Sequence, residues 1–303
     1  MSSGPLRLQV SEGDAGARLD RFLAEPVGSR ARAQHLIEAG QVRVDGRACP
    51  KRHLLAAGEF VEVFEVEPAG VADDAPTSPA PFTVAYQDRH LLVIDKPAGV
   101  VVHPGRGHRE GTLSQALAAA GAAGGDPGRA GIVHRLDRDT SGLLVVARSD
   151  DVHRALSRLL ARRGITREYL ALVSGRPSAR TGTVDAPIGR ARRDRVLHST
   201  DTDAPREART HFEVRLALAR ATLLSVVLET GRTHQIRVHM AAIGHPVCGD
   251  RQYGTGGEYD LTRQFLHAAR LAFEHPVTGV AVEASSPLPD DLCAALARAR
   301  EAH

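Results

Sequence analysis

The stretch between residues 67 and 81 constrains the fold of this chain more than any other feature. It reads EPAGVADDAPTSPAP, with four prolines, two aspartates and no apolar periodicity. Proline fixes the backbone angle φ and lacks an amide donor, so this composition is typical of an extended, semi-rigid linker. We therefore predict two domains, residues 1–66 and 82–303, joined by a linker over residues 67–81.

The segment before the linker has the pattern of a small α+β domain. Two groups of apolar residues recur at helical spacing, namely Leu19, Phe22 and Leu23, then Ala33, Leu36 and Ile37, with Gly40 ending the second. Apolar residues then alternate over 42–44 and 60–66, and Asp45-Gly46 is typical of a hairpin turn. We expect two helices followed by strands.

The segment after the linker mixes strand and helix patterns. Strands are expected at residues 82–86, 91–95, 143–146, 168–173, 211–218 and 222–229. Helices are expected at residues 112–120, from a cap at Asp150 or Asp151 to residue 163, and from a cap at Thr233 to Gly244. This order predicts an α+β fold with a large mixed, mainly antiparallel sheet flanked by helices.

Residues 131–147, GIVHRLDRDTSGLLVVA, place charged residues and a turn directly before an apolar strand. Asp137 lies here between Arg135 and Arg138. Loops at strand ends often carry reactive side chains, so Asp137 is a candidate catalytic carboxylate. The alternative is that the aspartates, threonine and serine of this segment only form a turn by hydrogen bonding to nearby backbone.

Nearly all cationic side chains are arginines, since Lys51 and Lys96 are the only lysines, although the net charge is only +3. Arginine binds phosphate and stacks on bases, so this bias would suit RNA, but a GC-rich genome would also produce it. Two clusters have the spacing of phosphate-binding patches: Arg158, Arg162, Arg163 and Arg167, and Arg190, Arg192, Arg193 and Arg195. Solvated helix and loop faces would explain both clusters as well.

Several function classes lack their sequence signals. No apolar run approaches the ~18 residues of a membrane span, and the first residues lack a signal-peptide pattern, so we expect a cytoplasmic protein without a membrane partner. The three cysteines are widely separated, and the histidines after residue 233 contain no HExxH, so no metal is expected. The glycine-rich residues 121–131 lack the GK[ST] ending of a phosphate-binding loop.

Five segments, in order, resemble the successive motifs of RluA-type pseudouridine synthases. They are DKPAGVVVHPG at 95–105, HRLDRDTSGLLVVA at 134–147, REYLALVSG at 167–175, ETGRTHQIRVHMAAIGHPVCGD at 229–250 and FLHAARLAFEHP at 265–276. Such an ordered set is far more specific than one short motif. The resemblance implies the pseudouridine synthase fold and isomerisation of specific uridines in structured RNA, with large-subunit ribosomal RNA as the expected substrate.

Other functions stay open at this point. The tRNA members of the same family are an alternative, as is an RNA-binding ribosome-assembly factor that uses this scaffold without turnover. A carboxylate-dependent nucleoside hydrolase would be a third, and it would release free uracil. Detection of pseudouridine in RNA would separate the synthase from both the assembly factor and the hydrolase.

The reaction implied by the resemblance detaches uracil from ribose and rejoins it through carbon 5. The reaction involves no redox change and no group leaves, so no cofactor is expected. Asp137 is then the expected nucleophile, and whether it attacks the sugar, attacks the base or assists elimination stays open. A carboxylate in a dry pocket needs a compensating cation, for which Arg237 matches the family position and Arg232 is the competing candidate.

The resemblance assigns further roles around Asp137. Tyr169 would stack on the uracil as clamp, general base or both, and Leu266 would form the opposite apolar wall, although both types are ordinarily core residues. Arg135 would fill the space left by an extruded base, unless it forms a structural ion pair. Arg232 and His234 are further substrate-binding candidates. The uridine has to leave its stack to reach these groups, so base flipping is expected.

Residues 18–24, 29–47 and 58–63 resemble the S-four-like RNA-binding module of a ribosomal protein and many RNA-modifying enzymes. The resemblance implies a cationic face that contacts phosphates. Its candidate residues are Arg30, Arg32, Arg43, Arg47, Lys51 and Arg52. The expected partner is structured RNA, bound by a monomer.

Overall fold

The computed structural model describes residues 6–27, 30–64, 80–103, 111–126, 129–192, 194 and 197–302. The chain divides into two compact units, Met1–Pro76 and Thr77–His303. Of the predicted linker, residues 67–79 lie outside the described part of the chain. Arg193 and Arg195 of the second arginine cluster lie outside it too.

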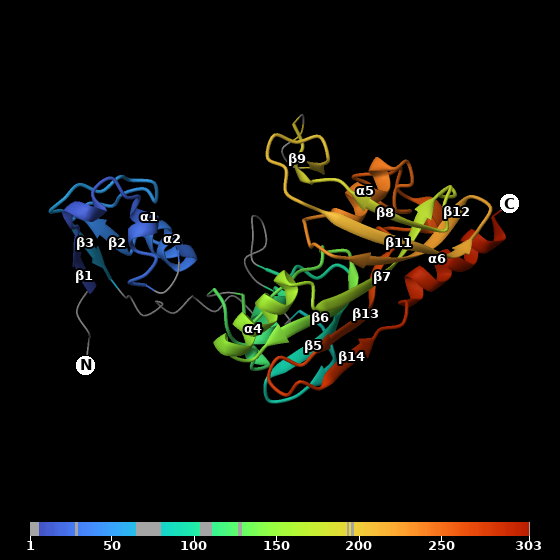
Figure 1. Ribbon diagram of the computed structural model, residues 1–303, viewed down its shortest axis with the longest axis horizontal. Coiled ribbons are helices and arrows are strands. Elements are labelled where there is room, and N and C mark those ends of the chain that lie inside the picture. The colour runs from blue at the N-terminus through green and yellow to red at the C-terminus, as the bar shows by residue number, and fades with distance from the viewer. Residues whose placement is uncertain are drawn as a thin grey trace. The chain divides into compact units, whose positions relative to one another are not determined.

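The first unit packs two helices on a three-stranded antiparallel sheet (Figure 1). Its strands, in spatial order, are β1 (Leu6–Gln9), β3 (Phe60–Val63) and β2 (Val42–Val44), and its helices are α1 (Leu19–Phe22), α2 (Arg30–Glu38) and the short 3₁₀ helix η1 (Glu12–Asp14). Apolar side chains from both helices and all three strands form one core, including Leu19, Leu36 and Val61. The predicted helices are confirmed, and the predicted strand at 60–66 ends at Val63.

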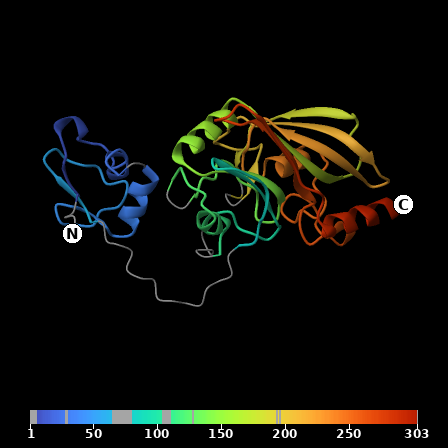
Figure 2. The same ribbon diagram turned by 90° about the horizontal axis from the view of Figure 1, so that it is seen from below.

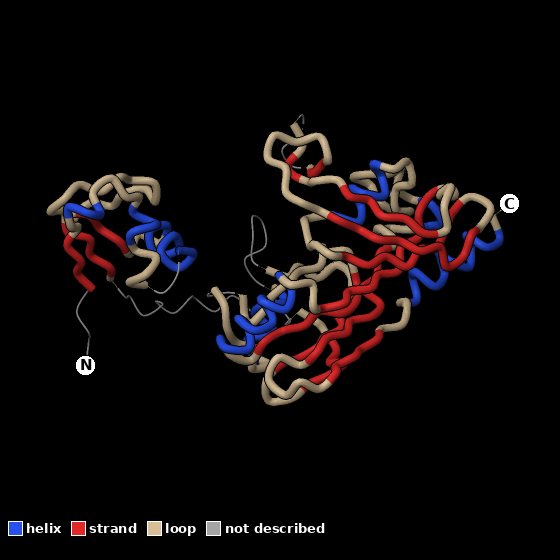
Figure 3. The backbone as a smooth tube through the Cα atoms, viewed as in Figure 1, coloured by secondary structure: helices blue, strands red, loops and turns tan. Residues whose placement is uncertain are grey.

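Among the described residues of the second unit, nine strands form one continuous sheet, drawn in red in Figure 3. The strands are β4 (Thr83–Gln87), β5 (Leu91–Lys96), β6 (Ser141–Ala147), β7 (Ile165–Ser174), β8 (Thr181–Asp185), β11 (Arg209–Ala217), β12 (Ala221–Leu228), β13 (Leu266–Glu274) and β14 (Ala281–Ser285). Their order is β4-β5-β6-β13-β7-β12-β11-β8, with β14 beside β13. The β6–β13 pair is parallel and the other pairs are antiparallel, which confirms the mixed, mainly antiparallel sheet.

Helices cover both faces of this sheet, and Figure 2 shows α4 on one side and α6 on the other. The remaining elements are α3 (Leu113–Ala119), α4 (Asp150–Ala161), α5 (Gln235–Ala242), α6 (Asp290–Glu301), η2 (Glu258–Asp260), and the ribbon of β9 (Gly189–Arg190) and β10 (His198–Ser199). Side chains alternate along a strand, so Leu91 and Val93 of β5 pack toward α4, while Leu92 and Ile94 enter the core that contains α3, α5 and α6. The central strands are apolar on both faces for this reason.

Two features fix the loop that carries Asp137. Gly142, with φ at +111°, lets β6 lie against β13, because a Cβ there would come within 2.3 Å of the Ala268 carbonyl oxygen. Lys96 at the end of β5 is completely buried. Its Nζ donates to the carbonyl oxygens of Pro97 at 2.8 Å, Val100 at 3.2 Å and Arg138 at 2.9 Å. The second feature ties the end of β5 to the residue after Asp137.

The caps of two helices differ from the prediction. Ser149, not Asp150 or Asp151, caps α4, and its hydroxyl accepts from the Val152 amide. α5 begins after His234, whose φ is +57°, rather than after Thr233. Here the side-chain oxygen Oε1 of Gln235 accepts a hydrogen bond from the backbone amide of Arg232 at 2.9 Å. A side chain of the helix itself thus binds the loop before the helix, at the end where a threonine cap was expected. None of the described helices is both long and apolar enough to span a membrane.

Candidate active site

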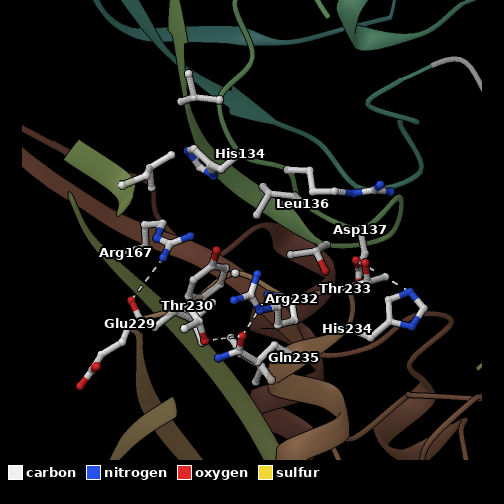
Figure 4. Close-up of a pocket in the computed structure, with 18 of the residues that line it drawn as sticks. His134, Leu136, Asp137, Arg167, Glu229, Thr230, Arg232, Thr233, His234 and Gln235 are labelled. Atoms are coloured by element: carbon white, nitrogen blue, oxygen red, sulfur yellow. Dashed lines mark hydrogen bonds and ion pairs between the residues drawn. The ribbon is translucent and has the colours of Figure 1, made fainter. Parts of the chain in front are cut away.

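A pocket of about 540 Å³ opens between the loop before β6, strand β7, and the loop from β12 to α5 (Figure 4). The structure brings together in its wall all the candidates predicted after the linker: Arg135, Asp137, Tyr169, Arg232, His234, Arg237 and Leu266. These residues come from four separate segments of the chain. The pocket volume lies in the range typical of small-molecule sites.

Asp137 faces a guanidinium inside this pocket. Arg237 Nη1 lies 3.1 Å from Asp137 Oδ2. Arg232, the competing candidate, instead donates from Nε to the Glu207 carbonyl oxygen at 2.8 Å. Arg237 is therefore the cation that compensates the Asp137 carboxylate, although 100 residues separate the two in sequence.

Arg237 is itself fixed by a second, fully buried carboxylate. Its Nε and Nη2 donate to Asp250 at 2.6 and 2.9 Å, and Nη2 also donates to Gln252 Oε1 at 2.7 Å. Burial opposes the charge, but Asp250 and then Asp137 outweigh it and raise the pKa of Arg237. Burial likewise opposes ionisation of Asp250, yet hydrogen bonds from Arg237 and from the Gln252 and Tyr253 amides lower its pKa. A bidentate pair of this kind sets the plane of the guanidinium.

His234 borders the other Asp137 oxygen, and a dashed line joins the two side chains in Figure 4. Its Nε2 lies 3.9 Å from Asp137 Oδ1, and its Nδ1 is in hydrogen-bond contact with the Tyr253 hydroxyl at 2.9 Å. Burial lowers the pKa of His234 against the pull of Asp137. A neutral imidazole therefore stands next to the carboxylate near pH 7.

Other histidines of the last third of the chain hold the fold together. His239 contacts the Thr210 hydroxyl and the Ala186 carbonyl, each at 2.8 Å, and His267 bridges Ser141 and Ser286. Within the described residues, His, Cys, Asp and Glu side chains form no group of three or more that could hold a metal ion.

Tyr169 and Leu266 form the apolar part of the wall. Tyr169 is on β7, paired with Val226 of β12 and Ala268 of β13, and it is only 5% exposed. Burial is the main cause that raises the pKa of its phenol. Its hydroxyl forms no hydrogen bond with another described residue, so it is available to a ligand. Leu266, the first residue of β13, belongs both to the main core and to the pocket wall.

Arg135 is exposed at the rim of the pocket. Within the described part of the chain it forms no ion pair, which does not support the structural alternative raised from the sequence. Its guanidinium is therefore accessible from solvent at the entrance to the pocket.

The first unit presents some of its predicted cations to solvent. Arg43, Arg47 and Arg52 are exposed, and Arg43 also lies over the Phe64 ring at 5.6 Å. Lys51 donates to Glu38 at 2.7 Å, so its charge is partly neutralised. The backbones of Arg30 and Arg32 are in α2, and their side chains lie outside the described part of the structure.

Sequence reasoning gave no role to Asp250 and His134, and none inside this pocket to Arg167. Asp250 holds Arg237, and it closes the fourth motif, so its place in that motif was the available signal. His134, which is half-buried, and Arg167, which is buried, both line the pocket. The sequence left a phosphate-binding patch and a solvated face open for the cluster that contains Arg167, and the structure buries Arg167 while Arg158, Arg162 and Arg163 stay exposed.

Comparison with known proteins identifies the family of this chain. Residues 90–242 match the RNA pseudouridylate synthase family, and residues 17–53 match the S4 domain. The chain belongs to the RNA pseudouridylate synthase family, and it is an isomerase that acts on RNA. The resemblance seen in the sequence, with its S4-like first domain, is thereby confirmed.

Its relatives are similar over almost their whole length. The chain is 43% identical to the uncharacterized RNA pseudouridine synthase YlyB of Bacillus subtilis (strain 168), covering 94% of this chain and 95% of that protein. It is 44% identical to ribosomal large subunit pseudouridine synthase D of Xylella fastidiosa, covering 96% and 92%. The solved structure of human RNA pseudouridylate synthase domain containing 1 is similar with a TM-score of 0.57 and 29% identity, over 71% of this chain and 86% of that one.

Proposed function

We propose that this enzyme converts specific uridines of large-subunit ribosomal RNA to pseudouridine, with Asp137 as nucleophile and the target uridine flipped into the pocket. It would act as a cytoplasmic monomer. The substrate class rests on the names of relatives such as the Xylella fastidiosa protein, which are similar over nearly the whole chain. The catalytic role rests on the pocket.

One observation carries the catalytic proposal. Asp137 lies in a pocket beside a guanidinium that a buried carboxylate holds in place. An ionised carboxylate loses hydration when a base fills the pocket, and Arg237 replaces part of that stabilisation. A turn-forming aspartate would not need such a partner.

The expected chemistry uses the residues of this pocket in order. The bond between ribose C1′ and uracil N1 breaks while Asp137 forms a covalent bond or stabilises the positive charge that develops on the sugar. The base turns, its C5 bonds to C1′, the C5 proton is lost, and N1 gains a proton, so the product is an isomer. Tyr169 is the group proposed to stack on the ring and to take the C5 proton. The raised pKa of Tyr169 keeps the phenol protonated in the free enzyme. As its oxygen accepts the C5 proton, the hydroxyl proton therefore has to pass to solvent, and solvent supplies the proton that N1 gains.

The test is pseudouridine mapping in large-subunit ribosomal RNA and in a tRNA pool, each lacking modification, after incubation with the enzyme. We expect new pseudouridines at a few positions of the ribosomal RNA, and none with Asp137→Asn, which is nearly isosteric and uncharged. Modification of tRNA alone would overturn the substrate class. Near-normal single-turnover yield with Asp137→Asn would overturn the nucleophile.

A further inference from the structure

Arg167 is a buried cation in the pocket wall that lacks an acidic partner. It is on β7, two residues before Tyr169, and is only 7% exposed. Residues two apart in a strand face the same side, so its side chain enters the same pocket as Tyr169. Figure 4 shows Arg167 across the pocket from Asp137 and His234.

Its guanidinium is almost unused by the protein. Within the described residues, Arg167 forms no ion pair, and its one hydrogen bond is a long one from Nη2 to the Leu228 carbonyl oxygen at 3.4 Å. Its Nε is buried without a hydrogen-bond partner. The carboxylate of Glu229, also in the wall, is engaged by His211 at 2.7 Å, by Arg209 at 3.3 Å and by Arg163. A buried charge left uncompensated costs several kcal/mol, so a ligand that compensates it gains correspondingly.

His134 supplies a second unused donor in this pocket. Its Nε2 accepts from the Val145 amide at 3.2 Å, which leaves the proton on Nδ1. That Nδ1 is buried and without a partner. Burial, and then the nearby charge of Arg167, lower the pKa of His134 to about 3, so the ring is neutral at physiological pH. Arg167 therefore supplies a charge and His134 supplies a neutral N–H donor.

The chain leaves room for the Arg167 guanidinium at Gly231. A Cβ on Gly231 would lie 2.9 Å from Arg167 Nη1. Glycine at this point of the β12–α5 loop therefore keeps the guanidinium in its present position.

We propose that Arg167, assisted by the Nδ1–H of His134, binds a phosphate oxygen of the RNA backbone next to the target uridine. The inference rests on the proposed function, because it takes the target base to lie between Asp137 and Tyr169. A full buried charge without an acid favours an anion over a neutral carbonyl oxygen, and phosphate is the anion that RNA brings. Two residues of β-strand span about 6.8 Å, close to the distance from a base to its own backbone.

The test compares Arg167→Met with Arg298→Met, which removes the same charge from an exposed position of α6 outside the pocket. Binding of an RNA fragment is measured from about 50 to 200 mM salt. Arg167→Met should weaken binding about tenfold and lower the log–log salt slope by about 0.7 to 0.9, with no loss of melting temperature. Arg298→Met should leave the slope within about 0.3 of the parent. Gly231→Ala, which displaces the guanidinium and keeps its charge, should also weaken binding.

A methylphosphonate linkage, which is uncharged, identifies the phosphate. The linkage is placed on one side of the uridine in one RNA and on the other side in a second RNA. At one of these two positions it should weaken binding by the parent enzyme. At that same position it should not further weaken binding by Arg167→Met. Equal losses for both proteins at both positions would overturn the proposal. An unchanged salt slope with a lower single-turnover rate would overturn it too, since Arg167 would then contact the base. The salt dependence of binding is measured without turnover. It therefore tests the phosphate contact even if the enzyme proves not to modify ribosomal RNA.

Discussion

Arg237 joins two carboxylates with different tasks. The Asp250 side chain is 0% exposed and the Asp137 side chain 17%, so one acid is sealed in the core while the other can meet a substrate. The buried acid uses two hydrogen bonds to set the plane of the guanidinium. The remaining nitrogen, Nη1, then points at Asp137. The surroundings of Asp137 thus depend on Asp250, a residue that does not line the pocket.

Asp250→Asn tests this dependence. The amide can accept only one of the two hydrogen bonds from Arg237, so the guanidinium loses its fixed plane. We expect single-turnover rate to fall by about 100-fold at saturating RNA, with RNA affinity within a few-fold of the parent. The matched control is Asp260→Asn, which removes an exposed acid that pairs with Arg298. An equal loss of RNA affinity would show instead that Asp250 supports the binding surface.

Tyr169→Phe separates stacking from proton transfer. The ring is kept and the buried hydroxyl has no protein partner among the described residues, so stability and RNA affinity should hold. Removal of a general base should lower the single-turnover rate by about 100-fold to 10,000-fold. Turnover at the parental rate would make Tyr169 a packing residue, and another group would have to take the C5 proton.

At the scale of elements, local patterns predicted the single strands and helices but not how they meet. The apolar runs of β5, β6, β7 and β12 are dense enough to locate each strand. The parallel β6–β13 pair and the weakly patterned β8 and β14 depend on tertiary contacts, which no local pattern encodes. The ion pair of Asp137 with Arg237 could be inferred only from the family motifs. The burial of Arg167 could not be inferred at all, because burial of an arginine leaves no mark in its own sequence window.

Gly142→Ala should break the junction behind the catalytic loop. The new Cβ would meet backbone atoms of Ala268, which cannot rotate away, and φ at +111° is strained for alanine. We expect a loss of about 3 kcal/mol or more in unfolding free energy. Chemical denaturation measures this loss. Gly244→Ala, with positive φ but open space around it, should cost less, and equal losses would mean that backbone strain alone is responsible.

Lys96 should give the protein a pH-dependent stability. Burial lowers its pKa to about 7, against the opposing charge of Asp139, whereas lysine in the unfolded chain titrates near ~10.4. Between these values the unfolded chain binds a proton that the folded chain lacks, so stability rises with pH. The unfolding free energy of the parent, relative to Lys96→Met, should increase by ~1 kcal/mol per pH unit from pH 7.5 to 9.

Denaturation series at three pH values measure this difference. The control is Lys51→Met, which changes the only other lysine. The difference in unfolding free energy between the parent and Lys51→Met should not change with pH. A flat difference for Lys96→Met as well would mean that its three carbonyl acceptors keep Lys96 charged throughout.

At the scale of the whole molecule, each unit has its own core, and the cationic side chains of the first unit that face solvent include Arg43, Arg47 and Arg52. Removal of residues 1–66 should leave a folded catalytic body whose single-turnover rate at saturating RNA changes little. If these three arginines contact phosphates, the log–log salt slope of binding should flatten by about 2 to 3. A collapsed rate in a folded truncated protein would show that the first unit helps to form the active site.

The strand order carries a consequence for synthesis of the chain. β13 is made late, yet it lies in the middle of the sheet, between β6 and β7. Asp137 precedes β6, whereas Tyr169 is on β7 and Arg237 follows β12, so the catalytic set is split between two halves that β13 joins. On a growing chain, the two halves of the pocket can be joined only after Leu266–Glu274 has been translated and has inserted between β6 and β7. The pocket therefore cannot form as soon as the residues of β6, β7 and β12 have been made, but only after β13 has followed them.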